Sequence, residues 1–229
     1  PQVIAPPAHG ILRMLRGRLK RRLLAIASVT IAMFVAPRAA WAEAFSPEEA
    51  LQHFQLADGF EVSLVASEPL VRQPVTMTFD RRGRLWVIQY LQYPNPAGLT
   101  PVEVDRYLRT KYDRRPEPPP KGPRGADRIT ILEDTDGDGR MDQAKDFVTG
   151  LNLASALALG DGGVYVGAAP YLLFYADRDG DDLPDGDPEV LLTGFGLEDA
   201  HAVVNSMPSG PGGWLYGAQG STVTADIGG

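Results

Sequence analysis

The chain contains no cysteine, and this absence excludes several kinds of site. Without thiols it can form no disulfide scaffold, no thiolate metal site, no cysteine nucleophile and no covalently attached c-type haem. The sequence also has no Walker loop, no Rossmann fingerprint, no G-x-S-x-G motif and no H-E-x-x-H motif. Nucleotide cofactors and hydrolase triads therefore have no support from the sequence.

Positive charge is scarce outside the N-terminal segment. Residues 1–42 carry seven basic residues and no acidic one, which leaves 15 basic and 29 acidic residues in the remainder, a net charge of −14. An acidic body does not neutralise phosphates, so we do not expect a nucleic-acid partner. Cations are more natural ligands for such a chain, and its composition does not indicate an oligomeric state.

The N-terminal segment has the three regions of a secretory signal peptide. A basic stretch at residues 16–22 is followed by an apolar run of 14 residues, 23–36, and by the small-x-small pattern at 40–42. This order predicts a signal peptide over residues 14–42. The run is shorter than the roughly 20 residues that span a membrane, although an uncleaved signal anchor stays an alternative.

Export follows from this interpretation. Met14 stands just before the basic stretch, so we interpret residues 1–13 as upstream translation. The mature protein would then begin near Glu43 and lie in the periplasm or at the cell surface.

A short N-terminal helix is expected within residues 43–57. Ser46, Pro47 and Glu49 match the N-cap, first and third positions of a capping box, and the helix should end near Gln55. Beyond it, residues 60–64 alternate apolar and polar side chains, which predicts a strand.

Short β-runs around glycine-containing turns repeat through the rest of the chain. Three hairpins are predicted, at residues 75–88, 157–167 and 209–217. Two further hairpins enclose aspartate-rich turns, at residues 131–150 and 173–194. With 25 glycines and 20 prolines, the composition also favours many turns and short strands.

The spacing of these hairpins predicts a repeat. The aspartate-rich turns recur after 43 residues, from Asp134 to Asp177, and the other turns after 80, from Gly83 to Gly163. The longer spacing fits one period plus an insertion of 37 residues at 90–126. A period of about 40–50 residues with two hairpins in each is typical of β-propeller blades.

We therefore predict an all-β chain whose residues 58–229 form an incomplete propeller, about three blades of a six-bladed ring. The expectation is that the chain is the N-terminal part of a longer protein. The insertion at 90–126 is proline-rich, which argues against ladder strands, and residues 102–112 are expected to form a short amphipathic helix.

Several segments carry a family likeness. They are residues 59–62, 66–71, 83–87, 134–142, 150–152, 158–166, 191–196 and 214–221. In their residues and their order along the chain, these segments resemble the N-terminal propeller of the PVC-type membrane-bound dehydrogenase domain proteins. The resemblance implies a fold similar to quinoprotein sugar dehydrogenases, with pyrroloquinoline quinone as cofactor and a sugar or alcohol as substrate. It also implies a downstream cytochrome c module with a CxxCH motif, or another electron acceptor.

His201 is the candidate catalytic residue that this resemblance suggests. In the quinoprotein sugar dehydrogenases, a histidine at nearly this position takes the proton of the substrate hydroxyl while hydride passes to the quinone. Imidazole suits this role because its ordinary pKa is near neutrality. Asp199, two residues earlier, could orient the ring, whereas Asn205, Gln219 and Ser221 could bind a polar ligand.

The aspartate-rich turns are candidate calcium sites. The first places carboxylates at Asp134, Asp136, Asp138 and Asp142. The second places them at Asp177, Asp179, Asp181 and Asp185. Alternate residues of a turning loop can direct oxygen ligands inward, as hard cations require. The first loop is not an EF-hand, because Lys145 stands where the bidentate glutamate would be. Solvated turns whose aspartates bind backbone amides are the alternative.

Two functions remain open at this point. One is an exported dehydrogenase propeller, active only as part of the full-length protein, that oxidises a sugar or alcohol with a quinone. The other is a calcium-stabilised propeller that binds glycans or protein partners without catalysis.

Overall fold

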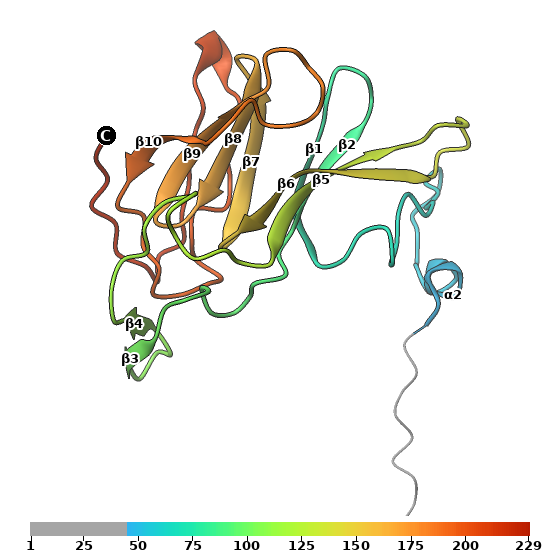
Figure 1. The fold of residues 1–229 in the computed structure, drawn as a ribbon. Coiled ribbons are helices and arrows are strands. Elements are labelled where there is room, and N and C mark those ends of the chain that lie inside the picture. The colour runs from blue at the N-terminus through green and yellow to red at the C-terminus, as the bar shows by residue number, and fades with distance from the viewer. Residues whose placement is uncertain (1–44) are drawn as a thin grey trace, which may run out of the picture. The chain divides into compact units, whose positions relative to one another are not determined.

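The computed structural model describes residues 45–229, and over this range the chain is all-β, as predicted. Its strands form two four-stranded antiparallel sheets and one two-stranded sheet, none of which closes on itself (Figure 1). The predicted signal peptide lies outside the described residues.

Helix α2 (Pro47–Leu51) begins at the predicted capping box. The Ser46 hydroxyl accepts the Glu49 amide at 3.1 Å, and the Ser46 amide donates to the Glu49 carboxylate at 3.0 Å. The helix ends at Leu51 rather than near Gln55. None of its residues is buried, and a short helix without a packed face has little to extend it.

Both four-stranded sheets are meanders. The first has the order β1-β2-β5-β6, with β1 (Pro74–Phe79), β2 (Leu85–Gln89), β5 (Asp127–Glu133) and β6 (Gln143–Leu151). The second runs β7 to β10, with β7 (Ala154–Gly160), β8 (Gly163–Ala168), β9 (Tyr171–Ala176) and β10 (Glu189–Thr193). The first two predicted hairpins and both aspartate-rich hairpins are thereby confirmed.

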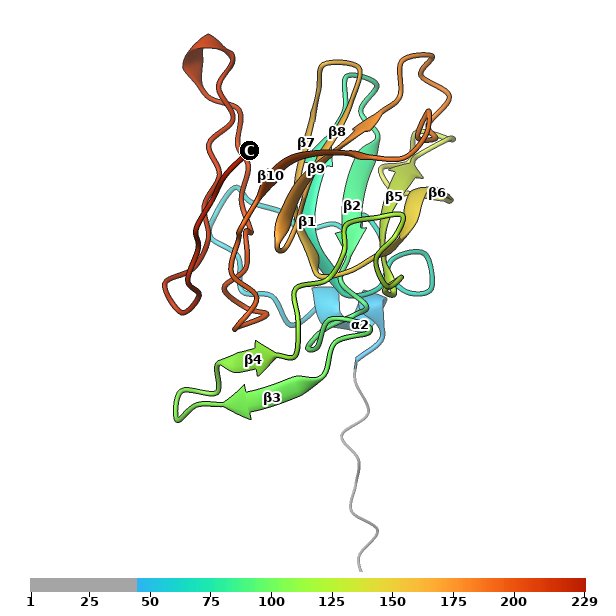
Figure 2. The same ribbon diagram turned by 60° about the vertical axis from the view of Figure 1, so that its left-hand side comes forward.

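The two sheets pack against each other through the main hydrophobic core. Trp86 and Ile88 point from β2 into this core, where they meet Val164 and Val166 of β8. Residues between them in β2, such as Val87, point to the opposite face, as the two-residue period of a strand requires. Strand β7 lies beside β1 and β2 (Figure 2).

The third predicted hairpin is only partly formed. After β10, the backbone pairs through isolated bridges, including Ser206 with Ala218 and Ser209 with Leu215. A 3-10 turn, η1 (Pro211–Gly213), occupies the tip. Proline has no amide hydrogen and glycine loses much backbone entropy on ordering, so this tip does not support a continuous ladder.

Three local predictions are wrong. Residues 60–64 form no strand, because no strand of residues 45–229 pairs with this segment. Residues 102–112 form a hairpin instead of a helix, with strands β3 (Pro101–Val104) and β4 (Thr110–Tyr112). The proline-rich insertion therefore does contain a ladder, which is possible because Pro101 is the first residue of its strand. The turn of this hairpin is held by Asp105, whose Oδ1 accepts the amides of Tyr107 and Arg109 at 2.8 and 3.0 Å.

The meander topology sorts the connections to opposite ends of the sheets. The turns β1–β2, β5–β6, β7–β8 and β9–β10 lie at one end, here called the turn end, with both aspartate-rich loops. The insertion at 90–126 and the segment that follows β10 start from the other end, here called the insertion end. In Figure 1, the β3–β4 hairpin of the insertion lies below the two larger sheets.

Candidate functional site

At the insertion end, His201 lies between an acid and a phenol. Its Nδ1 is 3.0 Å from Asp199 Oδ1, and its Nε2 is 2.8 Å from the hydroxyl of Tyr93. The rings of Tyr93 and His201 meet edge to face, with centroids 5.2 Å apart. Because the His201 side chain is 74% exposed, solvent or a ligand can reach this group.

Asp199 is fixed on both of its carboxylate oxygens. Oδ1 accepts the backbone amide of His201 at 2.9 Å as well as facing the imidazole, and Oδ2 accepts the Thr222 hydroxyl at 2.7 Å. The Thr222 hydroxyl, followed by the bonds from His201, holds the pKa of Asp199 below its usual value. Asp199 is therefore a carboxylate at neutral pH and can accept a hydrogen bond from Nδ1–H.

The insertion builds the other side of this site. The Tyr90 hydroxyl donates to the Ala200 carbonyl at 3.0 Å, and the Thr110 amide of β4 donates to the Glu198 carbonyl at 2.7 Å. Together with the Tyr93 contact, these bonds attach three points of the insertion and its flank to residues 198–201. The insertion therefore has a positioning role at the predicted site residue.

A buried carboxylate anchors the chain next to Tyr93. Asp127 is fully buried, and its two oxygens accept the Gln92 amide at 2.6 Å and the Ala154 amide at 2.9 Å. Burial raises the pKa of Asp127 to about 6, although the backbone amides oppose this shift. The anchor fixes the start of the insertion to the connection between the two sheets.

The other predicted ligand-binding residues differ in their surroundings. Asn205 and Ser221 are exposed. Gln219 is half-buried, and its side-chain carbonyl oxygen is buried without a hydrogen-bond partner among the described residues. Because this oxygen is itself buried, Gln219 does not present it to a ligand, whereas Asn205 and Ser221 are accessible.

At the turn end, the two aspartate-rich loops share a backbone design. The Asp136 side chain accepts the amide of Asp138 at 3.2 Å. In the second loop, 43 residues later, the Asp179 side chain accepts the amide of Asp181 at 3.3 Å. The amides of Asp142 and Asp185 likewise donate to equivalent carbonyls, both at 2.8–2.9 Å. The predicted repeat of these loops is therefore present in their hydrogen bonds.

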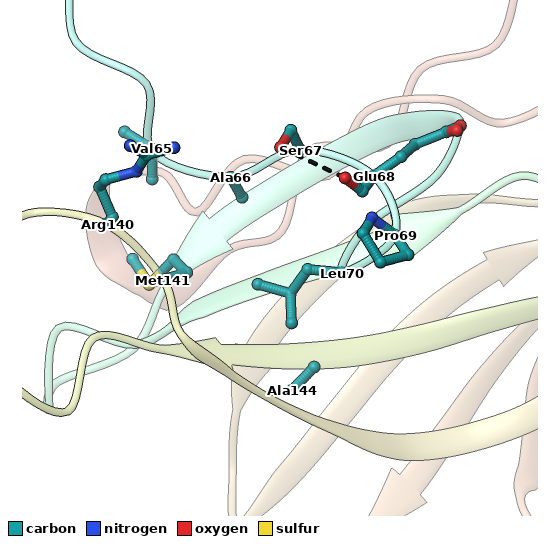
Figure 3. A pocket seen from close by; sticks show the side chains of 9 residues that line it. All are labelled: Val65, Ala66, Ser67, Glu68, Pro69, Leu70, Arg140, Met141 and Ala144. Carbon is teal, nitrogen blue, oxygen red and sulfur yellow. Dashed lines mark hydrogen bonds between the residues drawn. The ribbon is translucent and has the colours of Figure 1, made fainter. Parts of the chain in front are cut away.

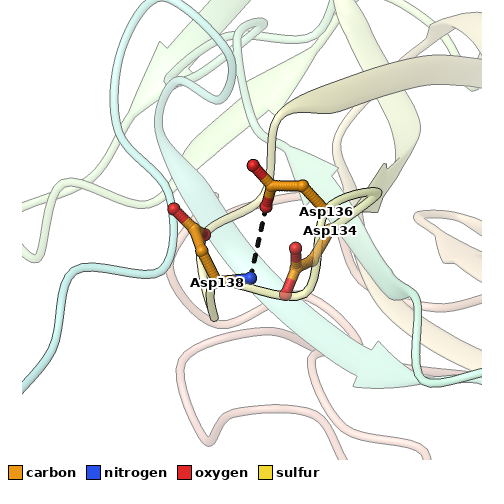
Figure 4. A group of neighbouring side chains, drawn as sticks. All are labelled: Asp134, Asp136 and Asp138. Carbon is orange, nitrogen blue, oxygen red and sulfur yellow. Dashed lines mark hydrogen bonds between the residues drawn. The ribbon is translucent and has the colours of Figure 1, made fainter.

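The first loop gathers three of its four predicted ligands. Asp134, Asp136 and Asp138 bring carboxylate oxygens within 4.8 Å of one another (Figure 4). Asp142 lies outside this group and accepts hydrogen bonds from Thr135. Both oxygens of Asp134 accept backbone amides, which lower its pKa, so this loop largely satisfies its own carboxylates.

The second loop gathers Asp177, Asp179 and Asp185 within the same distance, whereas Asp181 lies outside the group. Here one oxygen, Asp177 Oδ1, is buried and has no hydrogen-bond partner among residues 45–229. Burial raises the pKa of Asp177, followed by the opposing effect of the Gly180 amide. The second loop thus contains an acceptor that its own backbone leaves unsatisfied.

An arginine that the sequence analysis did not single out joins this loop to the first sheet. Arg84 of the β1–β2 hairpin donates to Asp182 through both terminal nitrogens, at 2.7 and 2.8 Å, and to Asp80 through Nε at 2.8 Å. Asp182 has a φ of +65° and stands where the first loop has Gly139, with a φ of +89°. An aspartate in place of the glycine at this position of the repeat is the sequence signal that could have indicated this contact.

A pocket of about 420 Å³ lies on the face of the first sheet that the second sheet does not cover. Figure 3 shows residues 65–70 along one side and Arg140, Met141 and Ala144 along the other. Leu70 and Met141 pack there against Leu85, Val87 and Leu132. The lining is mostly apolar and contains no group of the His201 site.

Tyr93, Thr222 and Asp127 are the other residues that sequence reasoning missed. None of them belongs to a motif, and each acquires its role from a partner at least 23 residues away. Among residues 45–229, no helix is long and apolar enough to cross a membrane.

Comparison with known proteins gives a family but no activity. The family described as a domain of unknown function (DUF7133) matches residues 46–227, so the chain belongs to that family. No significant match was found among curated proteins or among solved structures.

Proposed function

We propose that this DUF7133 chain is the propeller part of an exported dehydrogenase, in which His201 accepts the proton of a sugar or alcohol hydroxyl. The observation that carries the proposal is the Asp199–His201 pair, with Nδ1 and Oδ1 3.0 Å apart at an exposed position. In a neutral imidazole, a carboxylate that accepts a hydrogen bond from Nδ1–H leaves Nε2 unprotonated, which is the state a general base needs.

The propeller arrangement is supported by the two packed meanders. Strands β1 and β7, the first of each sheet, lie side by side, and the Thr76 hydroxyl donates to the Ser155 carbonyl between them at 2.7 Å. The far face of the first sheet exposes Met77 and Phe79, which are 58% and 62% exposed. In a ring of blades, such an apolar face would pack against another sheet.

The donor set fits hydroxyl oxidation, because this reaction needs a proton acceptor in addition to a hydride acceptor. A bound quinone, as in the PVC-type dehydrogenases that the sequence resembles, would supply the two-electron oxidation. The residues of this chain would bind the hydroxyl, hold its proton on the imidazole and stabilise the resulting cation through Asp199. Export is proposed from the signal-peptide pattern alone.

The test uses the full-length protein in a quinone-dependent dye-reduction assay with sugars and alcohols. We expect turnover in the wild type and a loss of at least about 100-fold in His201→Ala, since a general base contributes that much. His53→Ala is the matched control and should retain activity. Turnover that persists unchanged in His201→Ala would refute the proposed role.

A second candidate function is a calcium-stabilised propeller that binds a glycan or protein without catalysis. The buried, unpartnered Asp177 Oδ1 favours it, because a cation would satisfy an oxygen that the backbone does not. Calcium at 100 times its Kd should stabilise the fold by about 2.7 kcal/mol.

Thermal unfolding with calcium and with chelator tests this second function. Asp177→Asn should remove the difference in melting temperature, and the control Asp58→Asn should retain it. Equal melting temperatures in the wild type would exclude the site.

A further inference from the structure

We propose that Tyr93 is the residue that meets the substrate hydroxyl, and that it passes the proton to His201. This inference rests on the proposed function and assigns a chemical role to the insertion. The observation behind it is that Nε2 of His201, the nitrogen a general base would use, is already engaged by the Tyr93 hydroxyl at 2.8 Å.

The direction of that hydrogen bond follows from Asp199. As a carboxylate, Asp199 can only accept a hydrogen bond, so Nδ1 carries a proton, and in the neutral imidazole Nε2 carries a lone pair. In that state the Tyr93 hydroxyl donates a hydrogen bond to Nε2. A substrate proton can reach this nitrogen either after Tyr93 moves away or through the Tyr93 oxygen itself.

The structure favours transfer through Tyr93, because the residue is held from several sides. Its neighbour Gln92 is anchored through its amide to Asp127, and the Gln92 side chain accepts the Ala126 amide at 3.0 Å and donates to the Asn95 carbonyl at 2.9 Å. The Tyr90 ring packs beside Tyr93, with centroids 5.9 Å apart. Tyr93 is nevertheless 43% exposed, so a substrate can reach it.

The proton balance is complete. The substrate O–H bond breaks and its proton binds the Tyr93 oxygen, while the Tyr93 proton moves to Nε2 of His201. The imidazolium that forms is stabilised by Asp199. A bound quinone, the two-electron acceptor of the proposed function, would take the hydride from the substrate carbon, which would become a carbonyl carbon. Tyrosine is unchanged at the end of the step, and His201 holds the extra proton until solvent removes it.

The first test does not depend on activity. In the full-length protein, long-range ¹⁵N NMR of the histidine ring should show a protonated Nδ1 and an unprotonated Nε2. Tyr93→Phe should move the Nε2 resonance toward that of a free lone pair, whereas the control Tyr107→Phe, in the same insertion, should leave it unchanged. A protonated Nε2 in the wild type, or no shift in Tyr93→Phe, would overturn the relay.

The second test distinguishes proton transfer through Tyr93 from a role in which Tyr93 only covers His201. If Tyr93 relays the proton, Tyr93→Phe lowers kcat at least about tenfold with little change in KM, and Tyr107→Phe does not. If Tyr93 merely covers His201, its removal leaves kcat unchanged or raises kcat/KM, and the inference is wrong. If the wild type shows no turnover, the dehydrogenase proposal fails and the relay fails with it. The NMR result would then establish the hydrogen bond between Tyr93 and His201 without the relay.

Discussion

Replacing Arg84 should weaken the packing of the two large sheets more than any exposed substitution in the same turn. The guanidinium forms three charge-assisted hydrogen bonds, one to Asp80 and two to Asp182, and Arg84 is only 8% exposed. The two carboxylates keep 13% and 17% of their side-chain exposure, so water screens them partially when the arginine is lost.

The magnitude follows from this geometry. Removing one partner of a buried ion pair costs about 3–5 kcal/mol, and the residual hydration of the acids places Arg84→Met near 3 kcal/mol. For a domain of this size, that loss lowers the melting temperature by about 6–12 °C. Arg81→Met, in the same turn and exposed, should change the free energy of unfolding by less than about 0.5 kcal/mol.

A double-mutant cycle isolates the contact between the sheets. Urea unfolding of Arg84→Met, Asp182→Asn and the double variant should give a coupling energy of about 1.5–3 kcal/mol. Asparagine is suitable because it tolerates the left-handed backbone at position 182. A coupling energy below about 0.5 kcal/mol would mean that the bridge does not stabilise the fold and would refute the reasoning.

Two further predictions concern stability. The pKa of Asp127 is raised from 3.8 to about 6 in the folded chain, so the unfolded chain releases this proton first. The free energy of unfolding should therefore fall as pH rises from about 4 to about 6, by roughly 3 kcal/mol from this group. Urea unfolding at pH 4 and pH 7 should show this loss in the wild type and not in Asp127→Asn; equal pH dependence in both would contradict it. Separately, a Cβ at Gly167 would lie 2.8 Å from Val204 and 2.9 Å from Ala156, so Gly167→Ala should cost about 1–3 kcal/mol. Gly186→Ala, in open space, should cost far less; similar melting temperatures for the two variants would contradict the packing argument.

The parts of the fold that sequence reasoning predicted are those whose signals are local. The hairpin at 75–88 and both aspartate-rich hairpins have their strands and turn within a short stretch, so alternation and turn residues suffice to predict them. The capping box at Ser46 is equally local. In each case, the residues that interact are close in sequence.

The errors arise where a partner elsewhere decides the outcome. Residues 60–64 alternate like a strand but lack a neighbour, and the proline-rich insertion forms a hairpin because Asp105 organises its turn. At the candidate site, the Asp199–His201 pair was visible from its spacing. Its partner Tyr93 was not, because the contact joins residues that no local pattern connects. The roles of His201 and of the aspartate-rich loops stay predictions.

The contact between Tyr93 and His201 also constrains the order in which the chain folds. It closes a separation of 108 residues, and strands β3 to β10 lie in between. Closing so long a loop early would cost chain entropy that no contact yet offsets, because the intervening strands would not hold its ends together. The site should therefore assemble last, and a chain that has formed its sheets but not yet docked the insertion would be compact and chemically incomplete.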